Sequence, residues 1–333
     1  MPELRYNIAT KDWVIIATER AKRPDDFKRE KKEDKEIPAY SSSCPFCPGN
    51  EERAGEPTSV IKDKDGNWLV KVVPNKFPAL SCTGEPDKTN EGVYHSVNGV
   101  GVHEVIIESP LHNMTTAFYE NSQVENIIKI YKQRYLELSK DPRIKHVIIF
   151  KNHGLSAGTS LEHPHSQLLA TPIVSTQVAN RESAAREYHD ENGECVYCKM
   201  INEEIEAKER IIIENKNFIG IVPYAAFSPF HTWILPKKHK SSFGEISEEE
   251  IKDLASILKE TLAKLYCGLG NPDYNYCIRT SPFTDSENNY FHWYLAVIPR
   301  ITKPAGFEVG SGMFINASLP EQCAKFLREK AVI

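Results

Sequence analysis

Apolar residues recur at helical spacing in two long stretches of the chain. The first set is Val124, Ile127, Ile128, Tyr131 and Tyr135, and the second is Ile251, Leu254, Leu258, Leu262 and Leu265. Residues spaced three and four apart lie on one face of a helix. Ser122 with Glu125, and Ser247 with Glu250, stand three residues apart at the starts of these stretches, as capping boxes do. The pattern predicts two long amphipathic helices, each opened by a capping box.

Short runs rich in β-branched residues flank both predicted helices. The runs are Glu104 to Ile107 and His146 to Phe150 in the first half, and Thr232 to Leu235 and Tyr274 to Ile278 in the second half. Such runs are typical of strands. Each half therefore reads as a mainly antiparallel sheet carrying a long helix, an α+β arrangement, and strands of the two halves could join into one larger sheet.

Several motifs occur twice in the same order. The first series comprises Cys44 and Cys47, Val72-Val73-Pro74-Asn75, Ser109-Pro110-Leu111-His112, a helix, and His163-Pro164-His165. The second comprises Cys195 and Cys198, Ile221-Val222-Pro223-Tyr224, Ser228-Pro229-Phe230-His231, a helix, and His292-Trp293-Tyr294. Four shared features in one order indicate a duplicated unit. The expected halves are residues 1–180 and 181–333.

Composition limits the class of protein, the partners and the cell compartment that we expect for this chain. The 333 residues are 40% hydrophobic and 26% charged, which is typical of globular proteins. A net charge of -5 argues against bulk electrostatic binding of nucleic acid. The sequence shows neither a membrane-spanning apolar run nor a signal-peptide core near Met1, so we expect a cytoplasmic protein without a membrane or nucleic-acid partner.

The paired cysteines suggest metal binding. In a reducing compartment a C-x-x-C pair indicates metal or redox chemistry more often than a structural disulfide, and a redox pair needs no matched histidines. Each half offers a Cys2His2 set that suits tetrahedral zinc with no open position, which is a structural site. The predicted ligand sets are Cys44, Cys47, His112 and His163 in the first half, and Cys195, Cys198, His231 and His292 in the second.

The two halves differ at one decisive position. Aligning them places His163 on His292 and His165 on Tyr294, so only the first half keeps the second histidine. The imidazole of His165 is therefore not needed to build the repeated unit, and it is the candidate nucleophile. The alternative is that His165 is a polar residue satisfied by its neighbours, but Ser166, Gln167 and Asn152 would be unusual neighbours in a plain core.

A histidine nucleophile suits transfer of a phosphoryl or nucleotidyl group, because imidazole attacks phosphorus and leaves it readily. Ser166 and Gln167 are candidate donors of hydrogen bonds to the phosphoryl oxygens. Arg20 and Arg23 are candidate phosphate ligands, because a guanidinium offers a planar pair of donors.

The motifs as a set resemble the galactose-1-phosphate uridylyltransferase family within the histidine-triad superfamily. The likeness spans nearly the whole chain and includes Asp12-Trp13-Val14, Arg20 to Pro24, Cys44 and Cys47, Asn75 to Leu80, Glu104 to His112, Asn152-His153-Gly154 with Gly158, and His163 to Gln167. The resemblance implies duplicated histidine-triad-like units. It also implies a ping-pong reaction, in which a nucleotide sugar gives its nucleoside monophosphate to His165 and a second acceptor takes it away.

The same resemblance implies roles for individual residues. It places zinc on the first Cys2His2 set, Asn152, Ser160 and Gln167 at the phosphates, Arg20 and Arg23 near them, and Asn75 near the nucleoside. Gly158 belongs to the matching loop and is expected at the substrate site. The family also implies a homodimer.

Three features depart from the well-known uridylyltransferases. Ser166 replaces a glycine, Ala296 and Ile298 stand where two further histidines are expected, and Ser311-Gly312 stands in place of a Tyr-Glu pair. The family's second metal site, an iron site, is thus not carried over, and the second Cys2His2 set takes its place. These features are similar to ADP-glucose phosphorylases, which pass AMP to phosphate.

The leading hypothesis is transfer of UMP between UDP-glucose and galactose 1-phosphate. An NDP-sugar phosphorylase such as one for ADP-glucose, with phosphate as acceptor, is the main alternative. A histidine-triad type of hydrolase is a weaker alternative, because hydrolysis would waste the covalent intermediate. A non-catalytic zinc or nucleotide-binding scaffold is weaker too, because His165 is retained beside Gln167.

Overall fold

The fold was examined in a computed structural model that describes residues 1–17, 24–28, 37–283 and 288–332. The strands are β1 (Glu3–Tyr6), β2 (Trp13–Ile16), β3 (Ser59–Lys62), β4 (Trp68–Pro74), β5 (Lys88–Glu91), β6 (Tyr94–Val97), β7 (Val102–Ile107), β8 (His146–His153), β9 (His165–Thr171), β10 (Ile211–Glu214), β11 (Phe218–Ile221), β12 (Thr232–Pro236), β13 (Tyr274–Arg279), β14 (Tyr294–Pro299) and β15 (Phe314–Asn316). The α-helices are α1 (Glu51–Ala54), α2 (Asn121–Leu138), α3 (Thr176–Asn192), α4 (Val196–Ala207), α5 (Glu248–Leu269), α6 (Gly306–Ser311) and α7 (Pro320–Arg328). Short 3-10 turns are η2 (Pro24–Phe27), η3 (Thr116–Phe118), η4 (Leu155–Ala157) and η5 (Phe243–Glu245).

The large sheet confirms the predicted duplication. Its ten strands run β10-β11-β12-β14-β13-β8-β9-β7-β4-β3, so the order outward from the central β8–β13 pair is the same on both sides. All its neighbouring strands are antiparallel, and β8 pairs with β13 from Tyr274↔His153 to Cys277↔Phe150. The two halves therefore form one continuous sheet, and the α+β class is confirmed. Their predicted boundary at residue 180 stays a prediction.

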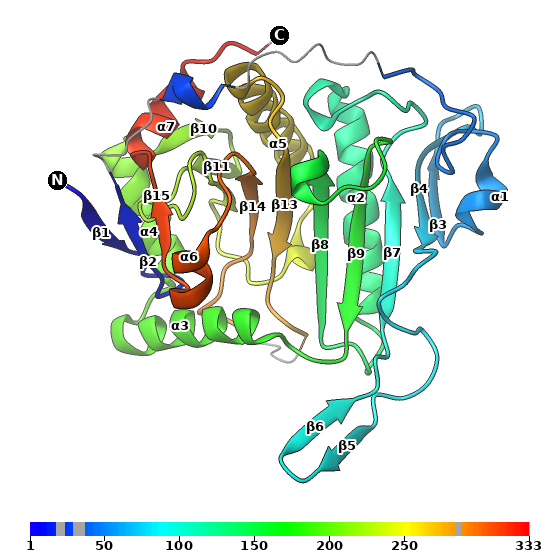
Figure 1. The fold of residues 1–333 in the computed structure, drawn as a ribbon, viewed down its shortest axis with the longest axis horizontal. Coiled ribbons are helices and arrows are strands. Elements are labelled where there is room, and N and C mark those ends of the chain that lie inside the picture. The colour runs from blue at the N-terminus through cyan, green and yellow to red at the C-terminus, as the bar shows by residue number, and fades with distance from the viewer. Residues whose placement is uncertain (18–23, 29–36, 284–287, 333) are drawn as a thin grey trace.

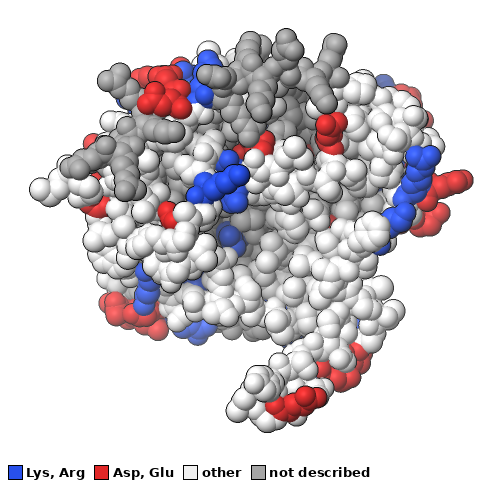
Figure 2. Space-filling view, viewed as in Figure 1, with Lys and Arg blue, Asp and Glu red and all other residues white. Residues whose placement is uncertain are grey.

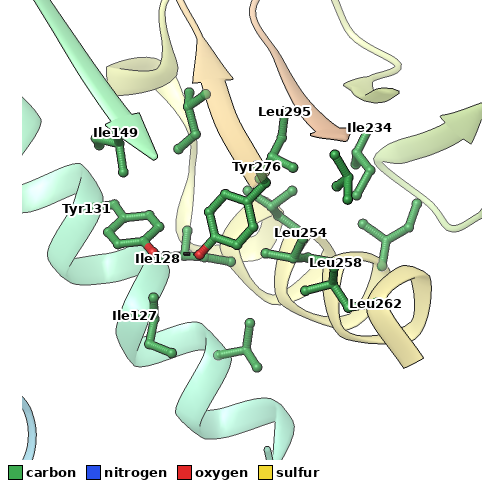
Figure 3. Packing of buried hydrophobic residues seen from close by; sticks show 14 of the residues in the cluster. Ile127, Ile128, Tyr131, Ile149, Ile234, Leu254, Leu258, Leu262, Tyr276 and Leu295 are labelled. Carbon is green, nitrogen blue, oxygen red and sulfur yellow. Dashed lines mark hydrogen bonds between the residues drawn. The ribbon is translucent and has the colours of Figure 1, made fainter. Parts of the chain in front are cut away.

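The two long helices cover one face of this sheet. Figure 1 shows α2 and α5 behind the strands, side by side, while the opposite face looks toward the viewer. Side chains from both helices and from the strands interlock in the main core, as Figure 3 shows for Ile127, Ile128, Tyr131, Ile149, Ile234, Leu254, Leu258, Leu262, Tyr276 and Leu295. Full burial of each such aliphatic side chain stabilises the fold by about 2 kcal/mol, so this shared core ties the halves together.

The helix starts are only partly as predicted. At α5, the Ser247 hydroxyl accepts from Glu250 N at 3.2 Å and Glu250 Oε2 accepts from Ser247 N at 2.7 Å, which confirms that capping box. At α2 the prediction is wrong: the helix begins at Asn121, its N-cap is Glu120, and no side chain caps it. Gln123 instead fixes this end by donating from Nε2 to the carbonyl oxygens of Leu69, at 2.9 Å, and Glu108, at 2.6 Å.

Smaller elements surround the large sheet. The strands β1, β2 and β15 form a separate sheet beside the second half, and the β5–β6 hairpin projects away from the body of the molecule (Figure 1). Within the described ranges, none of the helices combines the length and apolar character that a bilayer-spanning segment needs.

Candidate active site and metal clusters

The open face of the first half carries the candidate nucleophile. His165 is the first residue of β9 and pairs with Ile107 of β7. Leu168 and Ala170 point into the helix-covered core, so by strand alternation His165 and Gln167 point to the opposite face. This is the face turned to the viewer in Figure 2, where the surface is hollowed near its middle and Lys or Arg atoms lie at the rim and inside the hollow.

Hydrogen bonding fixes the tautomer of His165. Its Nδ1 lies 2.8 Å from the carbonyl oxygen of His163, which can only accept, so Nδ1 carries the proton. The other ring nitrogen, Nε2, then keeps its lone pair. The side chain is 7% exposed, and burial lowers the pKa of His165 below its ordinary value. Burial thus favours the neutral imidazole, and the hydrogen bond from Nδ1 selects the tautomer in which Nε2 is the reactive atom.

Ser166 has a different place from the one predicted. Its hydroxyl is fully buried on the helix-covered face, where it accepts from Tyr131 OH at 2.6 Å. Because successive residues of a strand face opposite ways, Ser166 cannot share the face of His165. The prediction that its hydroxyl serves the phosphoryl group is therefore wrong, and the residue joins a buried polar network beneath the site.

That network is centred on a buried ion pair. Lys151 Nζ binds Glu108 Oε2, and the two side chains are 2% and 0% exposed. Tyr131 OH lies 2.7 Å from Tyr276 OH and 3.4 Å from Glu108 Oε1. The network joins β8, α2 and β13 directly under the start of β9.

Other predicted substrate residues lie on or near the open face. Asn152 of β8 accepts from Asn275 Nδ2 at 2.8 Å, and Gly158, at φ 88°, ends the turn beside Asn152. Ser160 is exposed in the loop leading to β9, and Asn75 follows β4. Arg20 and Arg23 lie outside the described residues.

A histidine that sequence reasoning missed lies next to Gln167. His103 of β7 is half-buried on the open face, and its Nε2 lies 2.9 Å from Gln167 Oε1. Residues 103, 105 and 107 alternate along this strand, so the side chains of His103 and Ile107 share one face. Since Ile107 pairs with His165, the ring of His103 lies on the same face as His165.

The first predicted metal cluster is assembled. The ligand atoms of Cys44, Cys47, His112 and His163 all lie within 4.8 Å of one another, and all four residues are buried. Cys47 Sγ is 3.4 Å from His112 Nδ1 and 3.6 Å from His163 Nδ1, and the two Nδ1 atoms are 3.3 Å apart. Ligand atoms around tetrahedral zinc are separated by roughly 3.3–3.8 Å, given bonds of about 2.0–2.3 Å. The donor set therefore fits a zinc-sized ion.

The orientation of His163 supports this fit. Its Nε2 lies 2.8 Å from the carbonyl oxygen of Ser109, so Nε2 carries the proton and Nδ1 faces the cluster with its lone pair. A metal-binding histidine usually donates its other ring N–H to a backbone carbonyl or a carboxylate in this way.

The second cluster differs from the prediction in one ligand. The structure groups Cys195, Cys198, His239 and His292, again with all ligand atoms within 4.8 Å. Cys198 Sγ is 3.4 Å from His239 Nδ1 and 3.6 Å from His292 Nδ1. Hydrogen bonds involving Cys198, His239 and His292 lower the pKa of Cys195, which favours the thiolate that a metal binds.

His231 was predicted in place of His239, and that prediction is wrong. His231 is buried elsewhere, where its Nε2 accepts from Trp233 Nε1 at 3.1 Å and its ring lies 4.2 Å from that of Phe227. Burial lowers the pKa of His231 to about 3, so it is neutral.

The reason lies in where each motif stands relative to its strand. Ser109-Pro110-Leu111-His112 follows β7, whereas Ser228-Pro229-Phe230-His231 precedes β12. The true counterpart follows β12: Pro236 O lies 2.8 Å from His292 Nε2, as Ser109 O does from His163, and His239 is three residues after Pro236 as His112 is after Ser109. The matched i to i+3 spacing after the strand was the signal that identifies His239.

The chain is similar to known proteins along almost its whole length. The family model for the galactose-1-phosphate uridyl transferase N-terminal domain matches residues 1–175, and that for the C-terminal domain matches residues 181–331. The chain belongs to the galactose-1-phosphate uridylyltransferase family. It is thus an enzyme of a nucleotidyltransferase family, as the resemblance implied.

Named relatives cover the chain almost completely. An ADP-glucose phosphorylase from Arabidopsis thaliana is 38% identical over 98% of this chain and 93% of the relative. A galactose-1-phosphate uridylyltransferase from Thermotoga maritima is 30% identical over 100% of this chain and 99% of the relative. The crystal structure of an ADP-glucose phosphorylase from Arabidopsis thaliana with bound ADP-glucose matches at a TM-score of 0.85 and 33% identity, over 100% of both chains.

Proposed function

We propose that this family member carries a nucleoside monophosphate from a nucleotide sugar to a second acceptor through a covalent bond to Nε2 of His165. The observation that carries the proposal is the tautomer: the His163 carbonyl holds the proton on Nδ1, which leaves Nε2 as a neutral nucleophile on the open face. In the second half this position is Tyr294, which is buried at 1% exposure, so that half offers no such group.

The chemistry balances in two steps. In the first, Nε2 attacks the α-phosphorus, a P–N bond forms, and the bond to the bridging oxygen breaks, so sugar 1-phosphate leaves with the electron pair. In the second, an oxygen of phosphate or of a sugar 1-phosphate attacks the same phosphorus and the P–N bond breaks, which returns His165 to its neutral form. Gln167 of β9 and Asn152 of β8 stand on neighbouring strands, and their amide groups would donate to the phosphoryl oxygens.

The metal clusters are proposed to hold zinc. Cys44, Cys47, His112 and His163 would hold one ion, and Cys195, Cys198, His239 and His292 the other, each with four protein ligands. A zinc ion with four protein ligands crosslinks the chain. The residues of the first cluster then fix the loop that enters β9.

ADP-glucose with phosphate as acceptor is the favoured substrate pair. Its support is the 38% identity to a relative named ADP-glucose phosphorylase, against 30% for the Thermotoga maritima uridylyltransferase, together with the TM-score of 0.85 to the complex with ADP-glucose. UDP-glucose with galactose 1-phosphate is the second candidate, supported by the family models that match both halves.

Intact mass of the protein after incubation with either nucleotide sugar tests the proposal. We expect an AMP adduct from ADP-glucose that is absent in His165→Ala and is discharged by phosphate as ADP. A UMP adduct that galactose 1-phosphate discharges as UDP-galactose would instead select the second candidate. Absence of an adduct and of sugar 1-phosphate release with both nucleotide sugars would overturn the proposal.

A further inference from the structure

His103 makes a chain of contacts that ends at Gln167. The ring lies on β7, diagonally across from Gln167 on β9, and Asn75 N donates to the backbone carbonyl of His103 at 2.9 Å. Ala79 N lies 3.2 Å from His103 Nδ1. A backbone amide can only donate, so Nδ1 is the acceptor and cannot carry a proton.

The proton of the neutral ring must then be on Nε2. This atom is 2.9 Å from Gln167 Oε1, so the ring donates and the amide oxygen accepts. Asn75 Nδ2 lies 3.1 Å from the same Nε2. Since Asn75 Oδ1 accepts from Phe77 N at 2.9 Å, Nδ2 is a donor too, so in this tautomer its contact with Nε2 joins two donors and is not a hydrogen bond.

The consequence for Gln167 is a fixed carboxamide. A glutamine side chain can present either its oxygen or its NH2 group, which have similar size and opposite polarity. With Oε1 held by His103, the NH2 group is turned to the other side of the carboxamide. A phosphoryl group with its negative oxygens is attracted by that NH2 group and would be repelled by Oε1.

We propose that His103 is a positioning residue for nucleotidyl transfer, which acts by locking the amide of Gln167 so that its NH2 group serves the phosphoryl oxygens at His165. The inference rests on the proposed function, but it concerns a residue that makes no bond to the reacting phosphorus itself. Pre-oriented donors accelerate such reactions because the donor does not have to rotate during the reaction.

A double-mutant cycle separates this role from general support of the fold. The variants are His103→Ala, Gln167→Ala and both together, and the readout is the single-turnover rate of adduct formation beside the KM for the nucleotide sugar. We expect His103→Ala to slow adduct formation by about tenfold, the effect of losing one net hydrogen bond, with KM changed less. In the Gln167→Ala background the same change should have nearly no effect, since there is no amide left to orient.

Two further variants serve as controls. His103→Gln keeps a donor close to the place of Nε2 and should recover most of the rate, whereas a purely structural role would not predict that recovery. His95→Ala, on the exposed β5–β6 hairpin where His95 contacts Asn90, should leave the rate unchanged.

Independent effects that multiply in the double variant, or a His103→Ala rate equal to wild type, would overturn the inference while leaving the proposed function intact. A wild-type protein that forms no adduct with either nucleotide sugar would overturn both.

Discussion

The two halves of the large sheet have the same strand order and the same kind of Cys2His2 group, yet their open faces differ. In the second half, α3 and α4 supply Ala185, Val196, Tyr197 and Ile201 to a core that also contains Trp233, Leu235, Tyr294 and Ala296. In the first half the matching face carries His165, Gln167 and His103, beside a small buried apolar cluster around Val73, Val105 and Ile107. The comparison teaches that a repeated scaffold can hold a reactive face in one copy only, where packing has not covered it.

The covered faces differ as well. Beneath β9 the helix side holds the Lys151–Glu108 pair and the hydroxyls of Tyr131 and Ser166. Around β14 the helix side holds Trp293, whose ring packs 5.3 Å from Phe243 and 5.9 Å from Phe218. The start of β9 therefore has polar groups on both faces, while the residue before β14 packs among aromatic rings.

The largest effect on turnover is expected from replacing His165, the candidate nucleophile that only the first half has. His165→Ala should lower turnover by roughly 10⁴-fold or more, because the nucleophile is lost. The matched change Tyr294→Phe, at the equivalent strand position, should leave turnover within about threefold of wild type, since the proposed reaction takes place in the first half. Steady-state release of sugar 1-phosphate measures both, and a comparable loss in Tyr294→Phe would contradict the one-site view.

The next largest effect is expected from breaking the buried ion pair between Lys151 and Glu108, and it concerns stability. Lys151→Met leaves Glu108 buried without its cation and should lower the free energy of unfolding by about 3–5 kcal/mol. The double variant Lys151→Met with Glu108→Leu should recover part of that loss, because no buried charge is then left without a partner. Urea denaturation gives the values; a double variant as unstable as the single one would argue that the pair itself is required.

The metal clusters give the third comparison. His239→Ala should reduce metal affinity at the second cluster by about 100-fold or more, since one of four ligands is lost, whereas His231→Asn should keep it. Elemental analysis of the purified protein should show two metal ions per chain in wild type and in His231→Asn, and one in His239→Ala. Retention of two ions in His239→Ala would refute the assignment.

Adduct formation at His165 should also distinguish the two Cys2His2 groups. Cys198→Ser should lose the second metal and keep loading of His165, because its cluster lies in the half without a nucleophile. Cys47→Ser, in the cluster that holds the loop before His165, should lose both the first metal and most of the loading rate, which intact mass can follow.

The smallest effect concerns the helix starts. Ser247→Ala should lower the free energy of unfolding by about 1 kcal/mol, since the hydroxyl caps α5. Ser122→Ala should change it by less than about 0.5 kcal/mol, because Ser122 is exposed inside the first turn of α2 and caps nothing. Thermal or chemical denaturation of the two alanine variants, side by side, measures the difference.

Much of this arrangement could be predicted from the sequence, because periodicity and repetition are local properties of the chain. The two helices, the four strands and the first Cys2His2 cluster follow from them. The second cluster was misassigned because Ser228-Pro229-Phe230-His231 resembles the first ligand motif in letters but lies on the wrong side of its strand. Ser166 was misassigned because strand alternation was applied to His163 and His165 and not to the residue that follows.

The role of His103 could not be read from the sequence for a different reason. It depends on the hydrogen bond from Ala79, a backbone group in a loop 24 residues away, which decides the ring tautomer. Contacts of this kind depend on how loops settle against strands, and neither spacing nor composition encodes them in a visible way.

The central pairing of β8 with β13 determines what would happen if the two halves were separated. Each half ends at the seam in a strand whose backbone groups bond only to the other half on that side. A chain cut between the halves would turn both strands into exposed edges, which invite aggregation and swapping between copies. We therefore expect neither half to be stable as a module of its own.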